Sequence, residues 1–238
     1  MKSLLSVAIP AHNEERYIEF CIQSILASAD NAGQPVEIVV ALNRCTDGTR
    51  DIAESLGATC VVEDRKSIGA VRNAAVRAST SPAIATLDAD SWMQPGTVAE
   101  ILHRVYDNHF IGGGALVLPE RWSLGIAFSL LAIAPYVIRR NISTGMFWFR
   151  RESFDQIGGF NENLARVEDL DFALRLKALG AKQGRKYGTI RRSGIRTSCR
   201  KFDTFGDWYL FLNPGLVRKI FTGTDRAAAD LFYYDTKR

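Results

Sequence analysis

Short apolar segments alternate with helix-like patterns through the first half of the chain. Four segments, rich in apolar and β-branched residues, predict buried strands: Leu4–Ile9, Val36–Leu42, Thr59–Glu63 and Ala83–Leu87. Helical spacing of apolar residues predicts four helices: Glu15–Ser28, a helix capped by Thr46 or Asp47 that stops at Gly57, Ser67–Ser79, and one opened by Pro95. This alternating order predicts an α/β fold, with a mostly parallel sheet and helices on both faces.

The second half has a different pattern of apolar and polar residues. Strands are expected at Ile111–Leu118 and Thr144–Phe149, and a helix over Val167–Leu179 ended by Gly180. No linker separates the halves, so the prediction is one domain over 1–238. The second half ends in an aromatic C-terminal tail that includes Trp208, Phe221 and Phe232–Tyr234.

The longest apolar run, Leu124–Ile138, is shorter than the ~20 residues that cross a bilayer. A core helix or pocket wall is the favoured interpretation, and a helix lying in a membrane surface is the alternative. The apolar N-terminus is followed at once by Glu14 and Glu15, which favours a buried strand over a signal peptide. A cytoplasmic protein is expected, with peripheral contact at the inner face of the membrane left open.

Charge and cysteine usage exclude several classes of protein. The net charge of +4 hides a strip from Lys182 to Lys201 with eight Lys or Arg and no acidic residue. Such a strip fits a solvated face or a local anion site, and does not indicate nucleic-acid binding. The four cysteines form no C-x-x-C pair, so neither a zinc site nor a redox motif is indicated.

Polar residues follow each of the predicted parallel strands. Ligands of such sheets bind beyond the carboxyl ends of the strands, which directs attention to four loops. These are Pro10–Glu14, Asn43–Gly48, Asp64–Gly69 and Asp88–Trp92.

Asp88 and Asp90 come directly after a strand and are separated by one residue. Paired carboxylates suit Mg²⁺ or Mn²⁺, which complete their coordination shell with water and substrate phosphates. A calcium loop is excluded because its sixth position is not Gly and its twelfth is Ala99. The remaining alternative is a plain turn with helix-capping aspartates.

Glu168, Asp169 and Asp171 open a predicted helix. Acidic residues in a first turn stabilise the helix dipole, and one of them could also serve as a general base. Asn43 stands at a strand end, where its amide could contact the edge of a nucleotide base.

The chain resembles family 2 glycosyltransferases, whose catalytic domain has the Rossmann-like fold called GT-A. The resemblance extends from Ser6 to about Gly180, and it depends on six motifs in the family's order. These are Val7–Glu15, Cys45–Thr49, Gly69–Ala75, Leu87–Ser91, Ile157–Asn161 and Glu168–Leu176. One departure is Leu42–Cys45, where the family commonly has Asp-Asp-Gly-Ser.

The resemblance implies that residues 1–110 form a nucleotide-sugar-binding half and residues 111–238 an acceptor-binding half with the C-terminal tail. It also implies roles for individual residues. Asp169 would be the catalytic base, and Asp90 would hold Mn²⁺ or Mg²⁺. Acceptor-binding residues would be Gly145, Met146 and Glu168. Donor-binding residues would be Pro10, Ala11, Asn13, Glu14, Asn43, Lys66, Gly69, Asp88, Ala89, Arg196 and Arg200.

The implied activity is inverting transfer of a sugar from a nucleoside diphosphate, with UDP favoured, to the hydroxyl of a sugar or lipid-linked acceptor. Cell-surface polysaccharide or glycolipid synthesis is the expected setting. A processive synthase is not indicated, because the Gln-x-x-Arg-Trp motif is absent. The alternative is a non-catalytic nucleotide-sugar-binding or scaffold relative; a nucleotidyltransferase is disfavoured because the loop after the first strand contains no Gly. A homodimer stays open.

Overall fold

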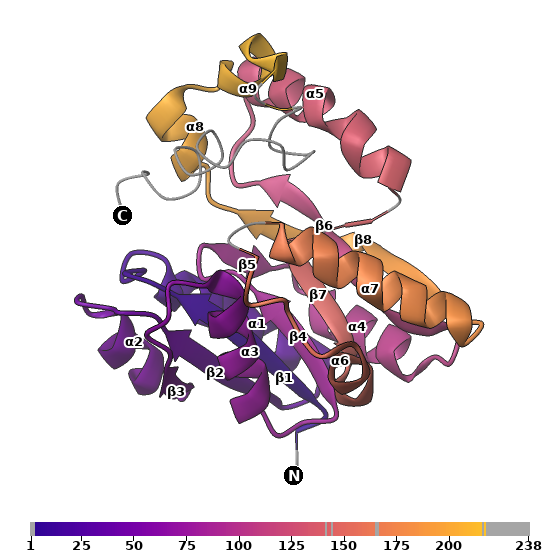
Figure 1. The fold of residues 1–238 in the computed structure, drawn as a ribbon. Coiled ribbons are helices and arrows are strands. Elements are labelled where there is room, and N and C mark those ends of the chain that lie inside the picture. The colour runs from indigo at the N-terminus through magenta and orange to yellow at the C-terminus, as the bar shows by residue number, and fades with distance from the viewer. Residues whose placement is uncertain (1–2, 141, 144, 165–166, 216, 218–238) are drawn as a thin grey trace. The chain divides into compact units, whose positions relative to one another are not determined.

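The structure is a computed structural model that describes residues 3–140, 142–143, 145–164, 167–215 and 217 (Figure 1). The chain forms two compact units, one made of 1–118 and 142–196, the other of 119–141 and 197–238. The expected donor and acceptor halves follow a different division and remain a functional expectation.

The first unit is built on an eight-stranded sheet in the order β3-β2-β1-β4-β7-β6-β8-β5. The strands are β1 (Leu5–Ala11), β2 (Val36–Leu42), β3 (Thr59–Val62), β4 (Ala83–Leu87), β5 (Ser91–Met93), β6 (Phe110–Pro119), β7 (Met146–Arg150) and β8 (Lys186–Thr197). β1 pairs in parallel with β2 and β4, and β2 with β3, while β7 runs antiparallel to β4 and β6. The predicted α/β class and mostly parallel sheet are confirmed, with β7 as the reversed strand.

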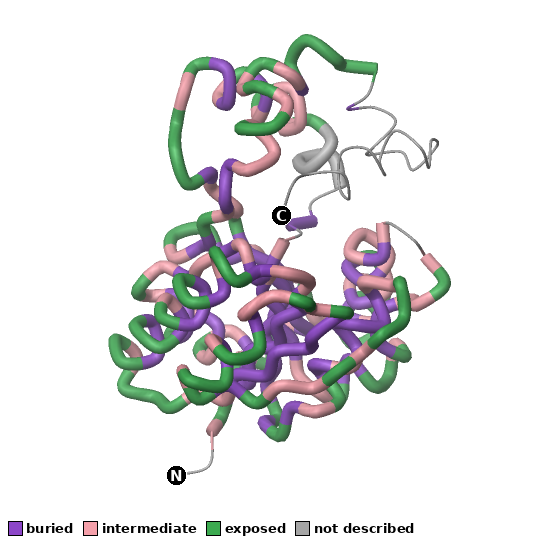
Figure 2. The backbone as a smooth tube through the Cα atoms, turned by 90° about the vertical axis from the view of Figure 1, so that its left-hand side faces the viewer, coloured by how far each residue is buried: buried purple, intermediate pink, exposed green. Residues whose placement is uncertain are grey.

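Helices cover both faces of the sheet, as predicted. One face packs on α1 (Ile18–Ala32), α2 (Thr49–Ser55) and α4 (Thr97–Tyr106), and the other on α3 (Ile68–Ala78), α6 (Arg151–Ile157) and α7 (Glu168–Lys182). Alternation along β1 divides its side chains between the faces, with Val7 and Ile9 in one core and Ala8 in the other. The central strands β1, β4 and β7 are almost fully buried (Figure 2), as expected for a sheet covered on both sides, whereas β3 has exposed positions such as Val62.

An aromatic cluster anchors the start of α7. Phe160 and Phe172 stack with ring centroids 4.1 Å apart, and Phe147 of β7 meets both rings edge-on. All three are fully buried, and each fully buried aromatic side chain contributes about 2 kcal/mol or more to folding. The first turn of α7 is thereby fixed against the sheet.

Several predicted helix boundaries are wrong. α1 runs from Ile18 to Ala32 instead of over Glu15–Ser28. The N-cap residue of α2 is Gly48, although the Asp47 side chain accepts from the Thr49 amide. The helix containing Leu179 does not stop at Gly180 but continues to Lys182, because Gly180 lies where the helix approaches β6. A Cβ at Gly180 would come within 2.7 Å of Ile111, so Gly is needed there for packing, not for termination. α4 begins at Thr97 after its cap residue Gly96, so Pro95 precedes the helix instead of opening it.

The second unit, described by itself, contains α5 (Leu124–Arg140), α8 (Arg200–Phe205) and α9 (Tyr209–Leu212). α5 packs on α9 through Ser129, whose hydroxyl donates to the carbonyl of Asp207 and accepts from the Phe211 amide. Within the described residues, no helix is long and apolar enough to cross a membrane. Phe221 and Phe232–Tyr234 of the expected aromatic tail lie outside the described residues.

Candidate active site

The Asp88–Asp90 turn lies at the carboxyl end of β4, as the strand order predicts. Beneath it, the buried thiol of Cys21 on α1 donates to the Asp88 carbonyl at 3.7 Å. Burial raises the pKa of Cys21, and the charges of Asp90, Asp88 and Glu14 raise it further. Three carboxylates from two loops therefore gather around one buried position.

Arg72, on α3, connects the two acidic motifs. Its guanidinium donates to the Asp88 carboxylate at 2.8 Å and lies 3.8 Å from the Glu168 carboxylate, with only 7% of the residue exposed. Burial lowers the pKa of Arg72, but Asp88, Glu168 and Asp169 outweigh it and raise the pKa above its ordinary value. The sequence analysis did not assign Arg72 to the site. Its position within the Gly69–Ala75 motif was the feature that could have indicated it.

Glu168 and Asp169 stand in the first turn of α7 in different environments. Glu168 is buried, and burial raises its pKa to about 7 against the opposing charge of Arg72. Asp169 is half-buried, and its carboxylate accepts from the Leu170 amide at 2.6 Å. The pair thus offers one carboxyl that is partly protonated near neutral pH and one more accessible carboxylate.

The residues at the Asp88–Asp90 turn fit a divalent cation in part. Among the described residues, no three His, Cys, Asp or Glu side chains form a ready-made metal cage. The half-buried carboxylates of Asp88 and Asp90 are hard oxygen donors that could bind such a cation, and Asp88 is also held by Arg72. This donor set suits Mg²⁺ or Mn²⁺ that take their remaining ligands from phosphate oxygens and water.

The loops after β1 and β2 are tied to each other by side-chain hydrogen bonds. Asn13, in a left-handed conformation (φ 53°), accepts from the Thr46 amide at 2.8 Å. The Glu14 amide donates to the Thr49 hydroxyl at 2.8 Å, and Glu15 accepts from the Gly48 amide. Pro10 and Ala11 continue β1 up to these loops.

Asn43 differs from its expected role. Both hydrogens of its amide donate to main-chain carbonyls, those of Glu63 and Arg65, so they do not point at a base edge. The residue is 8% exposed, and it fastens the loop between β3 and α3. The NH₂ group of Asn43 is therefore taken up by the main chain. Contact with a nucleotide base through the side-chain carbonyl oxygen of Asn43 stays a prediction.

Gly69 has a packing role in the structure. Its Cβ, if present, would lie 2.9 Å from the Asn161 carbonyl, so Gly allows α3 to meet the segment before α7. The neighbouring Lys66 is exposed. Donor contacts by Lys66 and Gly69 remain predictions.

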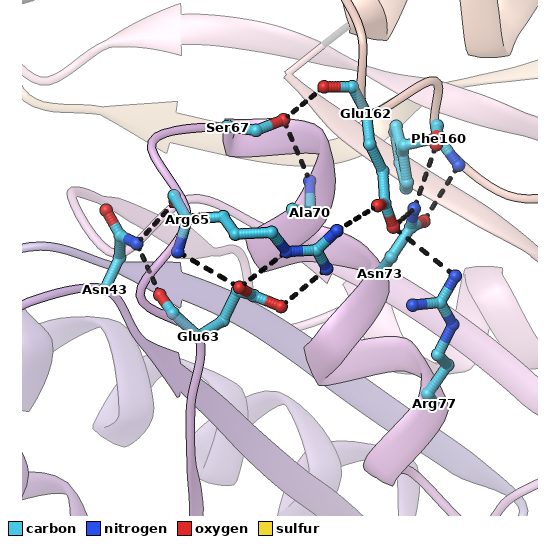
Figure 3. A network of polar contacts seen from close by, with 9 residues as sticks. All are labelled: Asn43, Glu63, Arg65, Ser67, Ala70, Asn73, Arg77, Phe160 and Glu162. Carbon is cyan, nitrogen blue, oxygen red and sulfur yellow. Dashed lines mark hydrogen bonds and ion pairs between the residues drawn. The ribbon is translucent and has the colours of Figure 1, made fainter.

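A polar network holds that same segment in place (Figure 3). Arg65 pairs with Glu63 at 2.7 Å and with Glu162 at 2.5 Å. Asn73 of α3 donates to Glu162 and to the Phe160 carbonyl, and its own carbonyl accepts from the Phe160 amide. Phe160 and Glu162 are thus fixed to α3, the helix that carries Arg72.

Two of the expected acceptor residues, Gly145 and Met146, lie at the end of the sheet that carries the Asp88–Asp90 turn. Met146 is the register partner of Leu87, the residue before Asp88. Gly145 has φ 98°, and a Cβ there would come within 2.8 Å of Val117.

Two arginines were expected at the donor site. Arg196 is exposed at the end of β8, whereas Arg200 belongs to the second unit, at the start of α8.

Comparison with known proteins agrees with this geometry. The model of the family described as "Glycosyl transferase family 2" matches residues 6–158. Chondroitin synthase from Escherichia coli is 25% identical over 190 residues, covering 74% of this chain and 27% of that protein. The chain spans 27% to 42% of the length of the first curated relatives it matches.

Two solved structures share the fold. S. aureus TarS in complex with UDP-GlcNAc superposes with a TM-score of 0.62 at 19% identity, covering 83% of this chain and 58% of that one. The mannosyltransferase PcManGT from Pyrobaculum calidifontis, in complex with GDP-Man and Mn²⁺, gives 0.60 at 20% identity, covering 99% and 71%. With the family model matching well over half of its length, the chain belongs to glycosyltransferase family 2.

Proposed function

We propose that this chain transfers one sugar at a time from a nucleoside diphosphate donor to an acceptor hydroxyl, with inversion at the anomeric carbon and with Mn²⁺ or Mg²⁺. UDP is favoured as the nucleotide. The observation that carries the proposal is the buried guanidinium of Arg72, which lies between Asp88 of the expected donor site and Glu168 of the expected acceptor site.

The donor side would bind and neutralise a diphosphate. A bound divalent cation would supply positive charge to the pyrophosphate, which makes the nucleoside diphosphate a better leaving group. Asp90 would hold that cation, while Arg72 keeps the Asp88 carboxylate oriented toward the ribose. The tied loops at Pro10–Glu14 and Asn43–Thr49 support a preformed nucleotide pocket.

The acceptor side would supply the base. Asp169, the more accessible member of the acidic pair, would take the proton from the acceptor hydroxyl as its oxygen attacks the anomeric carbon. The bond from that carbon to the phosphate oxygen breaks in the same step, and the electron pair leaves with the diphosphate. A single in-line displacement of this kind inverts the anomeric centre.

The two solved structures that share the fold do not fix the nucleotide for this chain, because one holds UDP-GlcNAc and the other GDP-Man. A sugar or lipid-linked acceptor is the proposed class. Each sugar nucleotide is therefore to be tested with a panel of acceptors.

The test is release of UDP or GDP from sugar nucleotides with Mn²⁺, with product stereochemistry read from NMR of the anomeric proton. Asp169→Asn is expected to lower kcat by about 10²- to 10⁴-fold, the usual contribution of a general base. The matched control is Asp171→Asn in the same turn, whose carboxylate pairs with Arg175. A product of retained configuration would contradict inversion, and release of neither nucleotide would favour the non-catalytic relative.

A further inference from the structure

The second unit carries an apolar stripe on the exposed side of α5. Three of its exposed residues are Leu124, Phe128 and Leu131, and Pro135 continues the line. Their spacing of four, three and four residues places them on one face of the helix. In a globular protein that face is normally polar, so an apolar stripe there indicates a surface that meets something apolar.

Aromatic side chains of the same unit extend the stripe. The ring of Phe128 stacks on Trp208 with centroids 5.6 Å apart and meets Phe211 edge-on at 5.3 Å. We call the exposed apolar residues of this unit the apolar face: Trp122, Leu124, Phe128, Leu131, Trp208, Phe211 and Leu212. They are half of the fourteen large hydrophobic residues that are exposed in the described part of the chain, although this unit is much the smaller one.

The opposite side of α5 packs against the rest of the second unit. Ile126 and Ser129 are fully buried, and Ser129 bonds to α9. Packing within the unit therefore accounts for one side of α5 and leaves the stripe unexplained. Figure 2 agrees, since the described backbone at 119–135 and 197–215 is mostly exposed or intermediate.

Charge favours a lipid surface as the occupant. The segments that make up the second unit contain ten Lys or Arg against six Asp or Glu, a net charge of +4, while those of the first unit are balanced at twenty each. The acidic Asp203 and Asp207 are both paired with Arg121. The same segments of the sequence thus combine a net positive charge with exposed Trp and Leu, and this combination is typical of proteins that bind the interface of an anionic bilayer.

We propose that the apolar face docks the chain onto the surface of an anionic bilayer, with α5 lying in the interface. α5 has 17 residues and does not cross the bilayer. Docking of this kind depends on apolar side chains entering the interface and on charge attraction, so it weakens when either is removed. The proposal is independent of the transfer reaction, because vesicle binding and nucleotide binding are measured separately.

The test is co-flotation of the full chain with vesicles of 70% phosphatidylcholine and 30% phosphatidylglycerol, and with vesicles of phosphatidylcholine alone. We expect binding to the anionic vesicles that falls with added salt. Leu124→Gln/Leu131→Gln should lower the partition coefficient about tenfold or more, given the apolar area lost from the interface. These leucines are 74% and 65% exposed, so the fold should tolerate the change, which a thermal melt checks.

The matched control is Phe20→Gln/Val62→Gln, two exposed apolar residues of the first unit at 63% and 57%. This variant should bind vesicles as the unchanged chain does. Equal binding by the leucine variant, or absence of binding to any vesicle, would overturn the proposal. Light scattering provides the competing outcome: if the unchanged chain is a dimer that the leucine variant dissociates, and neither binds vesicles, the apolar face is a contact between two copies.

Discussion

Two networks of charged side chains meet α3, and they differ chiefly in burial. Arg72 pairs with Asp88 and Glu168 in a site where its side chain is 9% exposed. Arg65 pairs with Glu63 and Glu162 while its side chain is 55% exposed. The same residue types therefore stand in two settings: in the buried network, burial raises the pKa of Glu168 against the opposing charge of Arg72, while the exposed network fastens loops.

The largest effect is expected from removal of the buried cation. Arg72→Met leaves the buried Glu168 carboxyl and the Asp88 carboxylate without their partner, which typically costs 3–5 kcal/mol, on the order of a third of a domain's stability. Urea unfolding at pH 8 measures the loss. In the Arg72→Met background, Glu168→Gln should raise stability by more than it does in the unchanged chain, because Arg72 no longer offsets the buried charge. An equal gain in both backgrounds would contradict the electrostatic coupling.

The next effect is a pH dependence that belongs to Glu168. Its pKa in the folded chain is about 7, above the ordinary value of 4.5, so the folded state binds more protons between these values and stability falls as pH rises. Glu168→Gln should match the unchanged chain near pH 4.5 and exceed it by on the order of 3 kcal/mol at pH 8. Urea unfolding from pH 4.5 to 8.5 tests this, and a pH-independent difference would be evidence that Glu168 does not titrate in this window.

The smallest effect is expected in the exposed network. Arg65→Gln should cost about 1 kcal/mol or less, since solvent screens this pair and its long side chain must be ordered to form it. Asn73→Ala is the sharper probe of the same loop, because Asn73 is buried and makes bonds to Phe160 and Glu162. If Arg65→Gln were as damaging as Arg72→Met, burial would not be the feature that separates the two networks.

The parallel half of the sheet was predictable from sequence, because each of β1 to β4 is a short apolar segment between polar loops. β8 was not, since Arg191, Arg192 and Arg196 obscure the buried positions at Ile190 and Ile195. β5 has three residues, too few for a pattern. α6 was missed as well.

The candidate site was predictable loop by loop but not in its connections. Strand order places Asp88 and the loop at Asn13 at one sheet edge. Nothing local indicates that Arg72 lies against Glu168, 96 positions along the chain, or that both hydrogens of the Asn43 amide are taken by the main chain. Such contacts depend on tertiary packing, which residue patterns do not encode.

The central claim is that the Asp88–Asp90 turn is a metal-dependent donor site, and calorimetric titration tests it most directly. UDP and then GDP would be titrated into the unchanged chain and into Asp90→Asn, with Mn²⁺ and again with EDTA. We predict that one nucleotide binds in Mn²⁺, and that its affinity falls about tenfold or more in EDTA and in the variant. Undiminished binding in EDTA, or no binding of either nucleotide under any condition, would contradict the account.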